Sequence, residues 1–314
     1  MANFVIIPDV SCDLNSQLRE RFGVDDCLPG TIYYPDGSMH SIDLDWGEMG
    51  PKEFYESMSD RKTLYKTAYA SPGDILNTYE RHLSQGKDVL SIVLSTGVSG
   101  TYQSCRVAAD QLQEKYPERK IIVIDSLRYS TSLALLVMMA TQKRSAGASI
   151  EETAQFVEEN KHRIHQMGPM DDLFFLVKTG RISNFKAFFG TLVGISPMAD
   201  FNSKGMAQVL AKFKGKKNAF SATIEYIRGT IENPEEQIIF VAHSNREQAA
   251  QALAEQIRKE FNPREIIINP VGMSSGASIG PGLVAAFYHG KPISADMSQE
   301  TALMNTILEN QKKK

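Results

Sequence analysis

Short hydrophobic runs alternate with longer segments of helical periodicity over most of the 314 residues. The short runs are rich in Val and Ile, and such alternation is typical of α/β folds with parallel strands. The pattern predicts strands at residues 4–7, 89–94, 121–124, 173–177, 196–201, 206–213, 238–242 and 266–271. We therefore expect an α/β fold whose first half contains a mainly parallel sheet.

Helices are predicted between these strands by apolar stripes and capping residues. Ser149 with Glu152, for example, forms a capping box at the start of a helix. Further helices are predicted from residue 72 and at residues 101–115, 130–143, 182–192, 218–231 and 247–261. The alternation starts again near residue 168, so we expect two α/β domains, residues 1–166 and 167–314.

Composition and charge exclude several classes of function. The formal net charge is −3 at pH 7, whereas a protein that binds nucleic acid needs a basic surface. No apolar run approaches the roughly 20 residues that span a bilayer, so we expect no stable membrane insertion. The sequence starts without the pattern of a secretory signal, and three cysteines are too few for a disulfide framework. We expect a cytoplasmic protein.

A turn rich in glycine and hydroxyl groups, LSTGVSGTYQSC, follows the second predicted strand. Gly97 lets the backbone turn tightly before a predicted helix. The N–H groups and the positive end of that helix favour an anion, and the hydroxyls of Ser95, Thr96 and Ser99 are within reach. The simpler alternative is that Ser99 only caps the helix.

A second turn of this kind, GMSSGASIGPG, spans residues 272–282 and is expected to lead into a helix near Pro281. It is suited to hold a phosphate or carboxylate, or it is only a flexible turn. Because it lacks the Lys-Ser/Thr ending of a P-loop, we expect no nucleotide there. Arg181, in the motif TGRIS, either binds a phosphate or a partner's carboxylate or points into solvent.

The candidates for catalysis and metal binding are weak. The sequence GVSGT is not the GxSxG of an esterase, and the histidines show no metal-binding spacing. We therefore expect neither a metal nor a cofactor. The alternative to a binding protein is an enzyme that acts on a small carboxylate or phosphate ester. It would use Ser95, Thr96 or Ser99, with His243 as the base.

Five motifs in this order match one family. IIPDVSCDL is similar to its N-terminal Asp-Ser-x-x-Asp-Leu turn, STGVSGTYQS to its Ser-Gly-Thr segment, and IDSLRYSTS to its central Asp-Ser motif. LFFLVKTGRIS matches its most specific signature, and SIGPG stands where it often has His-Thr-Gly-Pro-Gly. The chain thus resembles, over nearly its whole length, the DegV family of fatty-acid-binding proteins. That family includes the acyl-binding subunit of bacterial fatty-acid kinase.

The resemblance implies two α/β domains with a fatty acid in a cleft between them and its carboxylate held by hydroxyl groups. The matching positions are Thr67, Ser95, Thr96 and Ser278 for the carboxylate, Gly97, Ser99 and Gly280 for the supporting turns, and Arg181 and Lys214 for a phosphate or a partner. Three departures affect the site. Ser278 replaces a histidine, Val10 replaces the first serine of the N-terminal turn, and Ala68 and Ala70 remove polar side chains from the Thr67 loop.

We therefore expect a non-catalytic protein that binds a long-chain fatty acid and presents it to a separate fatty-acid kinase subunit. Each buried methylene contributes about 0.8 kcal/mol, whereas each head-group hydrogen bond adds about 1 kcal/mol. The tail would supply the affinity and the hydroxyls the orientation. Phe185, Phe188 and Phe189 are candidates to line the acyl site, although ordinary core packing explains them equally well.

Overall fold

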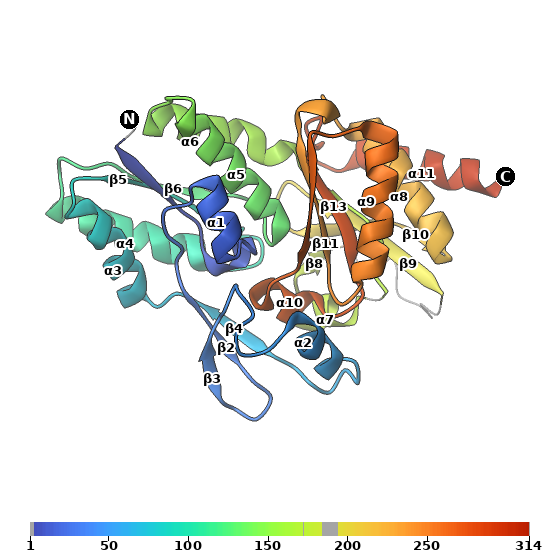
Figure 1. Ribbon diagram of the computed structural model, residues 1–314, viewed down its shortest axis with the longest axis horizontal. Coiled ribbons are helices and arrows are strands. Elements are labelled where there is room, and N and C mark those ends of the chain that lie inside the picture. Colours follow the sequence, from blue (N-terminus) through green and yellow to red (C-terminus); the bar gives the residue numbers. More distant parts are fainter. Residues whose placement is uncertain (1–2, 172, 184–193, 314) are drawn as a thin grey trace. The chain divides into compact units, whose positions relative to one another are not determined.

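The computed structural model describes residues 3–171, 173–183 and 194–313 (Figure 1). These residues form two compact units that are interleaved along the chain. The first comprises Met1–Glu48, Leu64–Lys161 and Gly272–Ala277, and the second comprises Met49–Thr63, His162–Val271 and Ser278–Lys314. Both units contain sheets and helices, and the first contains a parallel sheet, which confirms the predicted α/β class.

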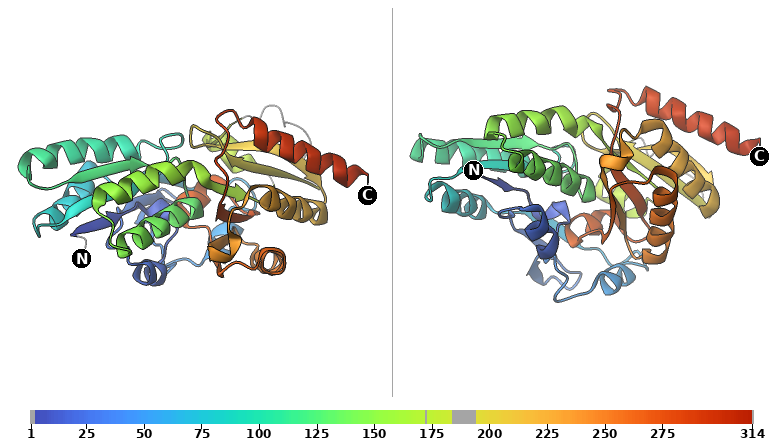
Figure 2. Two further views of the ribbon diagram at one scale, coloured as in Figure 1. Left: turned by 90° about the horizontal axis from the view of Figure 1, so that it is seen from above. Right: turned by 45° about the horizontal axis from the view of Figure 1, so that its top comes forward.

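The first unit is built on a parallel sheet with helices on both faces. The strand order is β1-β5-β6, with β1 (Phe4–Ile7), β5 (Asp88–Val93) and β6 (Ile121–Asp125). Successive side chains of a strand point to opposite faces, and both faces are buried, so the strands are apolar almost throughout. One face, which includes Val5 and Ile7, packs on α3 (Pro72–Leu83) and α4 (Thr101–Lys115). The other packs on α5 (Thr131–Ser145) and α6 (Ile150–Asn160) (Figure 2).

A small antiparallel sheet completes the first unit. Its order is β3-β2-β4, with β2 (Gly30–Tyr33), β3 (Met39–Ser41) and β4 (Lys66–Tyr69). The hydrophobic pattern did not predict these strands because they are short and mostly exposed or half-buried. The N-terminal segment adds the single 3-10 turn η1 (Val10–Cys12) and the helix α1 (Ser16–Phe22).

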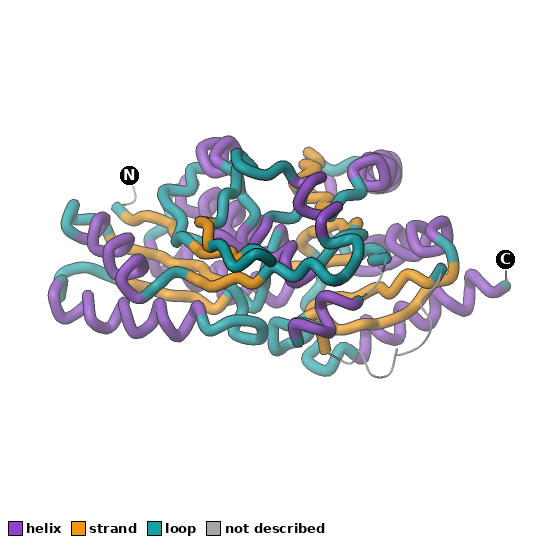
Figure 3. The backbone as a smooth tube through the Cα atoms, turned by 90° about the horizontal axis from the view of Figure 1, so that it is seen from below, coloured by secondary structure: helices purple, strands orange, loops and turns teal. Residues whose placement is uncertain are grey.

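The second unit contains two sheets (Figure 3). The larger has the order β12-β11-β13-β7, with β7 (Ile164–Met167), β11 (Ile238–His243), β12 (Glu265–Pro270) and β13 (Val284–His289). The smaller has the order β8-β10-β9, with β8 (Ile182–Ser183), β9 (Ile195–Phe201) and β10 (Ala207–Lys214). The helices are α2 (Pro51–Ser57), α7 (Phe174–Thr179), α8 (Lys216–Thr230), α9 (Glu247–Phe261) and α11 (Ser298–Lys312).

Three predicted elements differ from the structure. Residues 173–177, predicted as a strand, belong mostly to α7, because Leu173 and Leu176 are buried at helical spacing and Gly180 ends the helix at φ +72°. The helix predicted at 182–192 begins instead with β8, and residues 184–193, including the three phenylalanines named above, lie outside the described residues. The turn at 272–282 itself forms the helix α10 (Met273–Ile279), and the segment after it is strand β13 rather than a helix.

Gly168 provides a test of the packing of the larger sheet. A Cβ at this position would lie 2.0 Å from the Val284 carbonyl oxygen and 2.5 Å from the Ala285 Cα, both of which are backbone atoms. We therefore expect Gly168→Ala to lower the free energy of unfolding by about 3 kcal/mol, since the strand must move. The control is Gly50→Ala in the same unit, where a Cβ meets nothing within 4 Å, and which we expect to cost at most about 1 kcal/mol. Urea denaturation measures the free energy of unfolding of both variants, and an unchanged m-value shows that the comparison is valid. Equal losses would contradict the packing of β13 on Gly168.

Candidate functional site

Three loops of the first unit leave the same edge of the parallel sheet. β1, β5 and β6 are parallel, so the loops that start at Asp9, Leu94 and Ser126 all follow carboxyl ends of strands. This edge is where open α/β sheets bind their ligands. We call these three loops, together with Thr67 on β4, the strand-end site.

Asp9 connects two of these loops through its carboxylate. The Leu94 amide donates to Asp9 Oδ2 at 2.7 Å, and the Ser11 amide donates to Asp9 Oδ1 at 2.8 Å. Burial raises the pKa of Asp9, while these hydrogen bonds oppose the shift. A buried carboxyl with two backbone donors fixes the start of the turn that follows β5.

Ser95 and Thr96 begin that turn with different hydrogen bonds. The fully buried Ser95 side chain accepts from the Gly97 amide at 3.0 Å, and its own amide donates to the Arg128 carbonyl at 3.0 Å. Thr96 Oγ1 donates to Asp125 Oδ2 at 2.5 Å, and its amide donates to Asp125 Oδ1 at 3.2 Å. The Thr96 hydroxyl proton is therefore directed at Asp125, whose own oxygens order the turn.

Ser99 serves the start of α4. Its hydroxyl accepts from the Thr101 amide at 3.3 Å and contacts Thr101 Oγ1 at 2.8 Å, although the residue at the N-cap is Gly100, which offers no side-chain cap. This geometry supports the interpretation of Ser99 as a residue of the helix start. Gly100 itself gives no side-chain cap, and the N-terminal end of α4 remains suited to an anion.

β4 brings Tyr69 to the same turn. The hydroxyl oxygen of Tyr69 lies 3.4 Å from the position a Cβ would take on Gly100. Thr67 is two residues from Tyr69, so its side chain lies on the same face of β4. Thr67 is exposed on this face. The structure thus places Tyr69 of β4 against Gly100, while Ser95 and Thr96 lie in the turn after β5 and Thr67 is an exposed residue of β4.

The loop after β6 contains a buried arginine that the motifs did not single out. Arg128 is 1% exposed and is the largest fully buried side chain among the described residues. Its Nη1 donates to the Leu127 carbonyl at 2.7 Å, and Ser126 Oγ accepts from its amide at 3.0 Å. Arg128 thus places a buried guanidinium in the loop that follows the carboxyl end of β6. Its place directly after a buried strand was the available sequence signal.

Asp13 is a second buried carboxyl of the N-terminal loop. Ser130 Oγ donates to Asp13 Oδ2, and the Gly272 amide also donates to this carboxyl. Burial raises the pKa of Asp13 to about 7, against the effect of these two donors and reinforced by the negative charge of Asp9. Ser130 holds this contact from a backbone with φ +58°, an unfavourable conformation for serine.

The other predicted residues belong to the second unit. Ser278 is half-buried in the last turn of α10, and Gly280 follows that helix with φ +74°. Lys214 ends β10 and is exposed. His243 ends β11, where its Nδ1 accepts from the Arg246 amide at 3.4 Å and burial lowers its pKa. If the protein were an enzyme that used His243 as its base, that base would be a neutral histidine facing the start of α9.

Arg181 lies beside a cluster of cations around one aromatic ring. The guanidinium carbon of Arg61 is 5.3 Å from the centroid of Phe174, and Lys178 Nζ is 5.5 Å from it. Arg181 follows α7 directly and is exposed, with Nη1 donating to the Thr179 carbonyl. We call Arg61, Phe174, Lys178 and Arg181 the α7 basic surface. The sequence motif indicates only Arg181, because Arg61 is far from it in the chain and only the fold brings Arg61 to Phe174.

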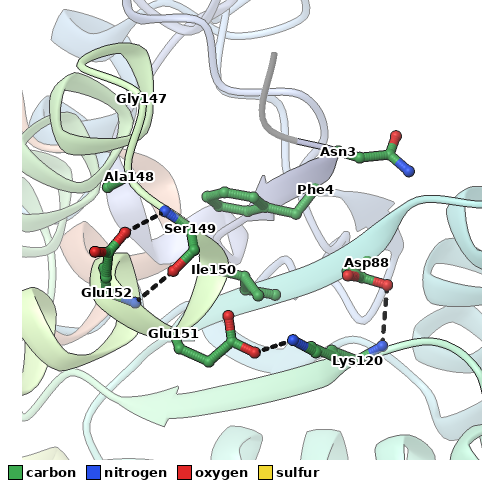
Figure 4. Close-up of a pocket in the computed structure, with 10 residues that line it drawn as sticks. All are labelled: Asn3, Phe4, Asp88, Lys120, Gly147, Ala148, Ser149, Ile150, Glu151 and Glu152. Carbon is green, nitrogen blue, oxygen red and sulfur yellow. Dashed lines mark hydrogen bonds and ion pairs between the residues drawn. The ribbon is translucent and has the colours of Figure 1, made fainter.

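A hollow of about 490 Å³ lies at the opposite, amino edge of the parallel sheet (Figure 4). Its charged groups are already paired with one another. Lys120 forms an ion pair with Glu151, its amide donates to Asp88 Oδ1 at 3.0 Å, and Ser149 and Glu152 form the predicted capping box. This hollow is therefore not the site that the motifs indicate.

The described residues contain neither a metal-binding group nor a membrane helix. In residues 3–171, 173–183 and 194–313, no three His, Cys, Asp or Glu side chains gather to hold a metal ion. Over the same ranges, no helix combines the length and apolarity needed to cross a membrane.

Comparison with known proteins gives consistent matches. The model of the DegV family of uncharacterised proteins matches residues 3–291. A DegV domain-containing protein of Clostridium perfringens is 32% identical over 290 residues, which cover 92% of this chain and 98% of that protein.

Solved structures agree with this match. A fatty-acid-binding DegV family protein from Thermus thermophilus has a TM-score of 0.81 at 25% identity, with 92% of this chain and 100% of that chain covered. The fatty acid kinase B3 protein of Streptococcus pneumoniae, loaded with linoleic acid, has a TM-score of 0.75 at 24% identity, with 93% and 100% covered. Because the family model spans nearly the whole chain, this protein belongs to the DegV family.

Proposed function

We propose that this protein binds a long-chain fatty acid and holds its carboxylate at the strand-end site. The observation that carries the proposal is the hydroxyl-rich turn from Ser95 to Gly100, which leads from the carboxyl end of β5 into the start of α4. Arg128 adds positive charge there. The names of the Thermus and Streptococcus proteins, which bind fatty acids, support the same ligand.

The head-group residues have distinct roles in this proposal. Thr67 and Ser95 donate to the carboxylate, with the α4 N–H groups behind them. Thr96 positions the turn, because its hydroxyl donates to Asp125 at 2.5 Å. Gly97 and Ser99 support the turn, while Ser278 on α10 and Gly280 after it keep the roles implied by the family motif.

Ser95→Ala tests the head-group assignment. We expect oleate to bind roughly tenfold to 150-fold more weakly, since one hydrogen bond to a charged group contributes about 1.5–3 kcal/mol. Oleyl alcohol, which has the same tail without the charge, should lose less affinity. Ser84→Ala, on the exposed end of α3, is the control. Tryptophan or fluorescent-probe competition titrations on delipidated protein measure the affinities, and native mass spectrometry measures a co-purified acid.

Two results would contradict these assignments separately. Absence of any fatty-acid adduct, together with no binding of added oleate, would contradict the function. Binding of oleate with equal affinity by the Ser95 and Ser84 variants would contradict only the site.

We also propose that the protein presents its lipid to a kinase subunit through the α7 basic surface and Lys214. In this proposal the chain itself carries out no chemistry. The support is the gathering of Arg61 and Lys178 around Phe174, with the exposed Arg181 directly after α7, which suits an acidic partner. The Streptococcus protein is named as part of a fatty acid kinase, which supports a kinase subunit as the partner.

Charge reversal tests the partner surface. We expect Arg181→Glu with Lys214→Glu to leave oleate binding unchanged and to lower phosphorylation of bound oleate at least about tenfold, since opposed charges become like charges. The assay combines the protein, ATP and the fatty-acid kinase catalytic subunit of the same genome. Lys259→Glu, on the exposed end of α9, is the control. Normal phosphorylation by the double variant would place the partner contact elsewhere.

A further inference from the structure

The phenol of Tyr69 lies against the turn that leads from β5 into α4. Its hydroxyl oxygen is 3.4 Å, and its Cζ is 3.7 Å, from the position that a Cβ on Gly100 would take. Gly100 directly precedes Thr101, the first residue of α4. Because glycine has no side chain, the tip of the phenol lies close to the backbone of the turn. Tyr69 therefore brings a hydroxyl group to this turn from a different segment of the chain.

The backbone on both sides of Tyr69 is held by packing within the first unit. Tyr69 pairs with Gly30 in the antiparallel contact between β4 and β2. Ala70, the next residue, is 3% exposed and belongs to the core cluster that also contains Cys105 and Ala108 of α4. β4 and α4 are thus joined through buried side chains one residue away from the phenol. This packing fixes the approach of the Tyr69 backbone to the start of α4.

The turn uses several of its own hydroxyl groups to hold its shape. Thr96 Oγ1 donates to Asp125 Oδ2 at 2.5 Å, and the Ser99 hydroxyl contacts Thr101 Oγ1 at 2.8 Å. The Tyr69 hydroxyl, by contrast, has no hydrogen-bond partner among residues 3–171, 173–183 and 194–313. A head group at this turn therefore finds in Tyr69 a donor that the fold itself does not use.

A phenol in this position is suited to an ionised head group. Its O–H donates one hydrogen bond, and such a bond is roughly twice as strong when the acceptor is charged as when it is neutral. Tyr69 is 45% exposed, so its hydroxyl is accessible to a ligand that enters from solvent. The ring behind the hydroxyl is apolar and covers part of the turn. The contact thus favours a carboxylate over an uncharged alcohol at the end of the same acyl chain.

We propose that Tyr69 donates its phenolic hydrogen to the carboxylate of the fatty acid and contributes to the selection of an ionised head group. The inference rests on the proposed function, because it adds a residue to the strand-end site. Ser95 binds the carboxylate from the turn after β5, and Tyr69 binds it from β4. The phenol takes no part in any covalent step.

Tyr69→Phe tests this assignment, because it removes the hydroxyl and keeps the ring. We expect delipidated Tyr69→Phe protein to bind oleate about tenfold more weakly than wild type, the lower end of the range for a bond to a charged group, since the phenol is partly exposed. Oleyl alcohol, which has the same tail without the charge, should lose about threefold at most. Competition titrations with a fluorescent fatty acid measure both affinities.

Tyr33→Phe is the matched control. Tyr33 belongs to β2 of the same sheet and is 38% exposed, which is close to the exposure of Tyr69. It pairs with Lys66, three residues before Tyr69 on β4, so its side chain points to the opposite face of the sheet. We expect this variant to bind oleate and oleyl alcohol as wild type does.

Infrared spectroscopy of bound oleate tests the contact itself. The antisymmetric stretch of a carboxylate responds to the hydrogen bonds that it accepts, and isotope labelling of the carboxyl carbon separates this band from those of the protein. We expect the band to move in Tyr69→Phe and to stay in place in Tyr33→Phe. A purely structural role of Tyr69 would leave the band unchanged.

The outcomes separate this inference from the function on which it rests. Equal affinity of the Tyr69 and Tyr33 variants for oleate, or an unchanged carboxylate band, overturns the role of Tyr69 and leaves the function intact. An equal fold loss for oleate and oleyl alcohol shows that the phenol only packs on the ligand, and it also overturns the inference. Absence of oleate binding in wild type overturns the proposed function and the inference with it.

Discussion

The carboxylate of Asp9 ties together the parts of the first unit on which its site depends. It accepts the amide of Leu94, directly after β5, and the amide of Ser11 in η1, which follows β1, so that the loops after two neighbouring strands share one contact. The turn from Ser95 to Gly100 then starts at a fixed point and direction. Replacing this contact with solvent would free both loops at once, because a buried carboxylate with backbone donors is costly to leave unpaired.

The long apolar strands and the capped helices of both units could be predicted from the sequence. Helix α4 (Thr101–Lys115) was predicted with its observed bounds, and the capping box of Ser149 and Glu152 is present. The β2-β3-β4 sheet could not be predicted, because its short strands show little burial and so no clear period. The buried run that opens α7 gave a strand prediction because a six-residue helix is too short for its period to differ clearly from that of a strand.

The candidate site was predictable as a set of hydroxyl-rich turns but not as a hydrogen-bond network. The sequence indicated both Ser95 and Thr96 as residues that bind the carboxylate, yet the Thr96 hydroxyl donates to Asp125. The second unit shows how a comparable network can be balanced. Its buried Asp200 accepts from His165 at 2.6 Å and from the Tyr226 hydroxyl at 2.8 Å, so its charge is matched by a strong donor set. Asp13 accepts from the Ser130 hydroxyl and also lies near the carboxyl of Asp9, and only the three-dimensional contacts distinguish the two cases.

Residues Gly272–Ala277 belong to the first unit, although most of the second unit precedes them in the sequence. This order has a consequence for synthesis of the chain. On the ribosome, the three parallel strands emerge within the first 125 residues, but the amide that Gly272 gives to Asp13 emerges almost 150 residues later. Until then Asp13 has the Ser130 hydroxyl as a donor but not the Gly272 amide. Completion of this hydrogen bonding therefore waits for translation to pass through most of the second unit.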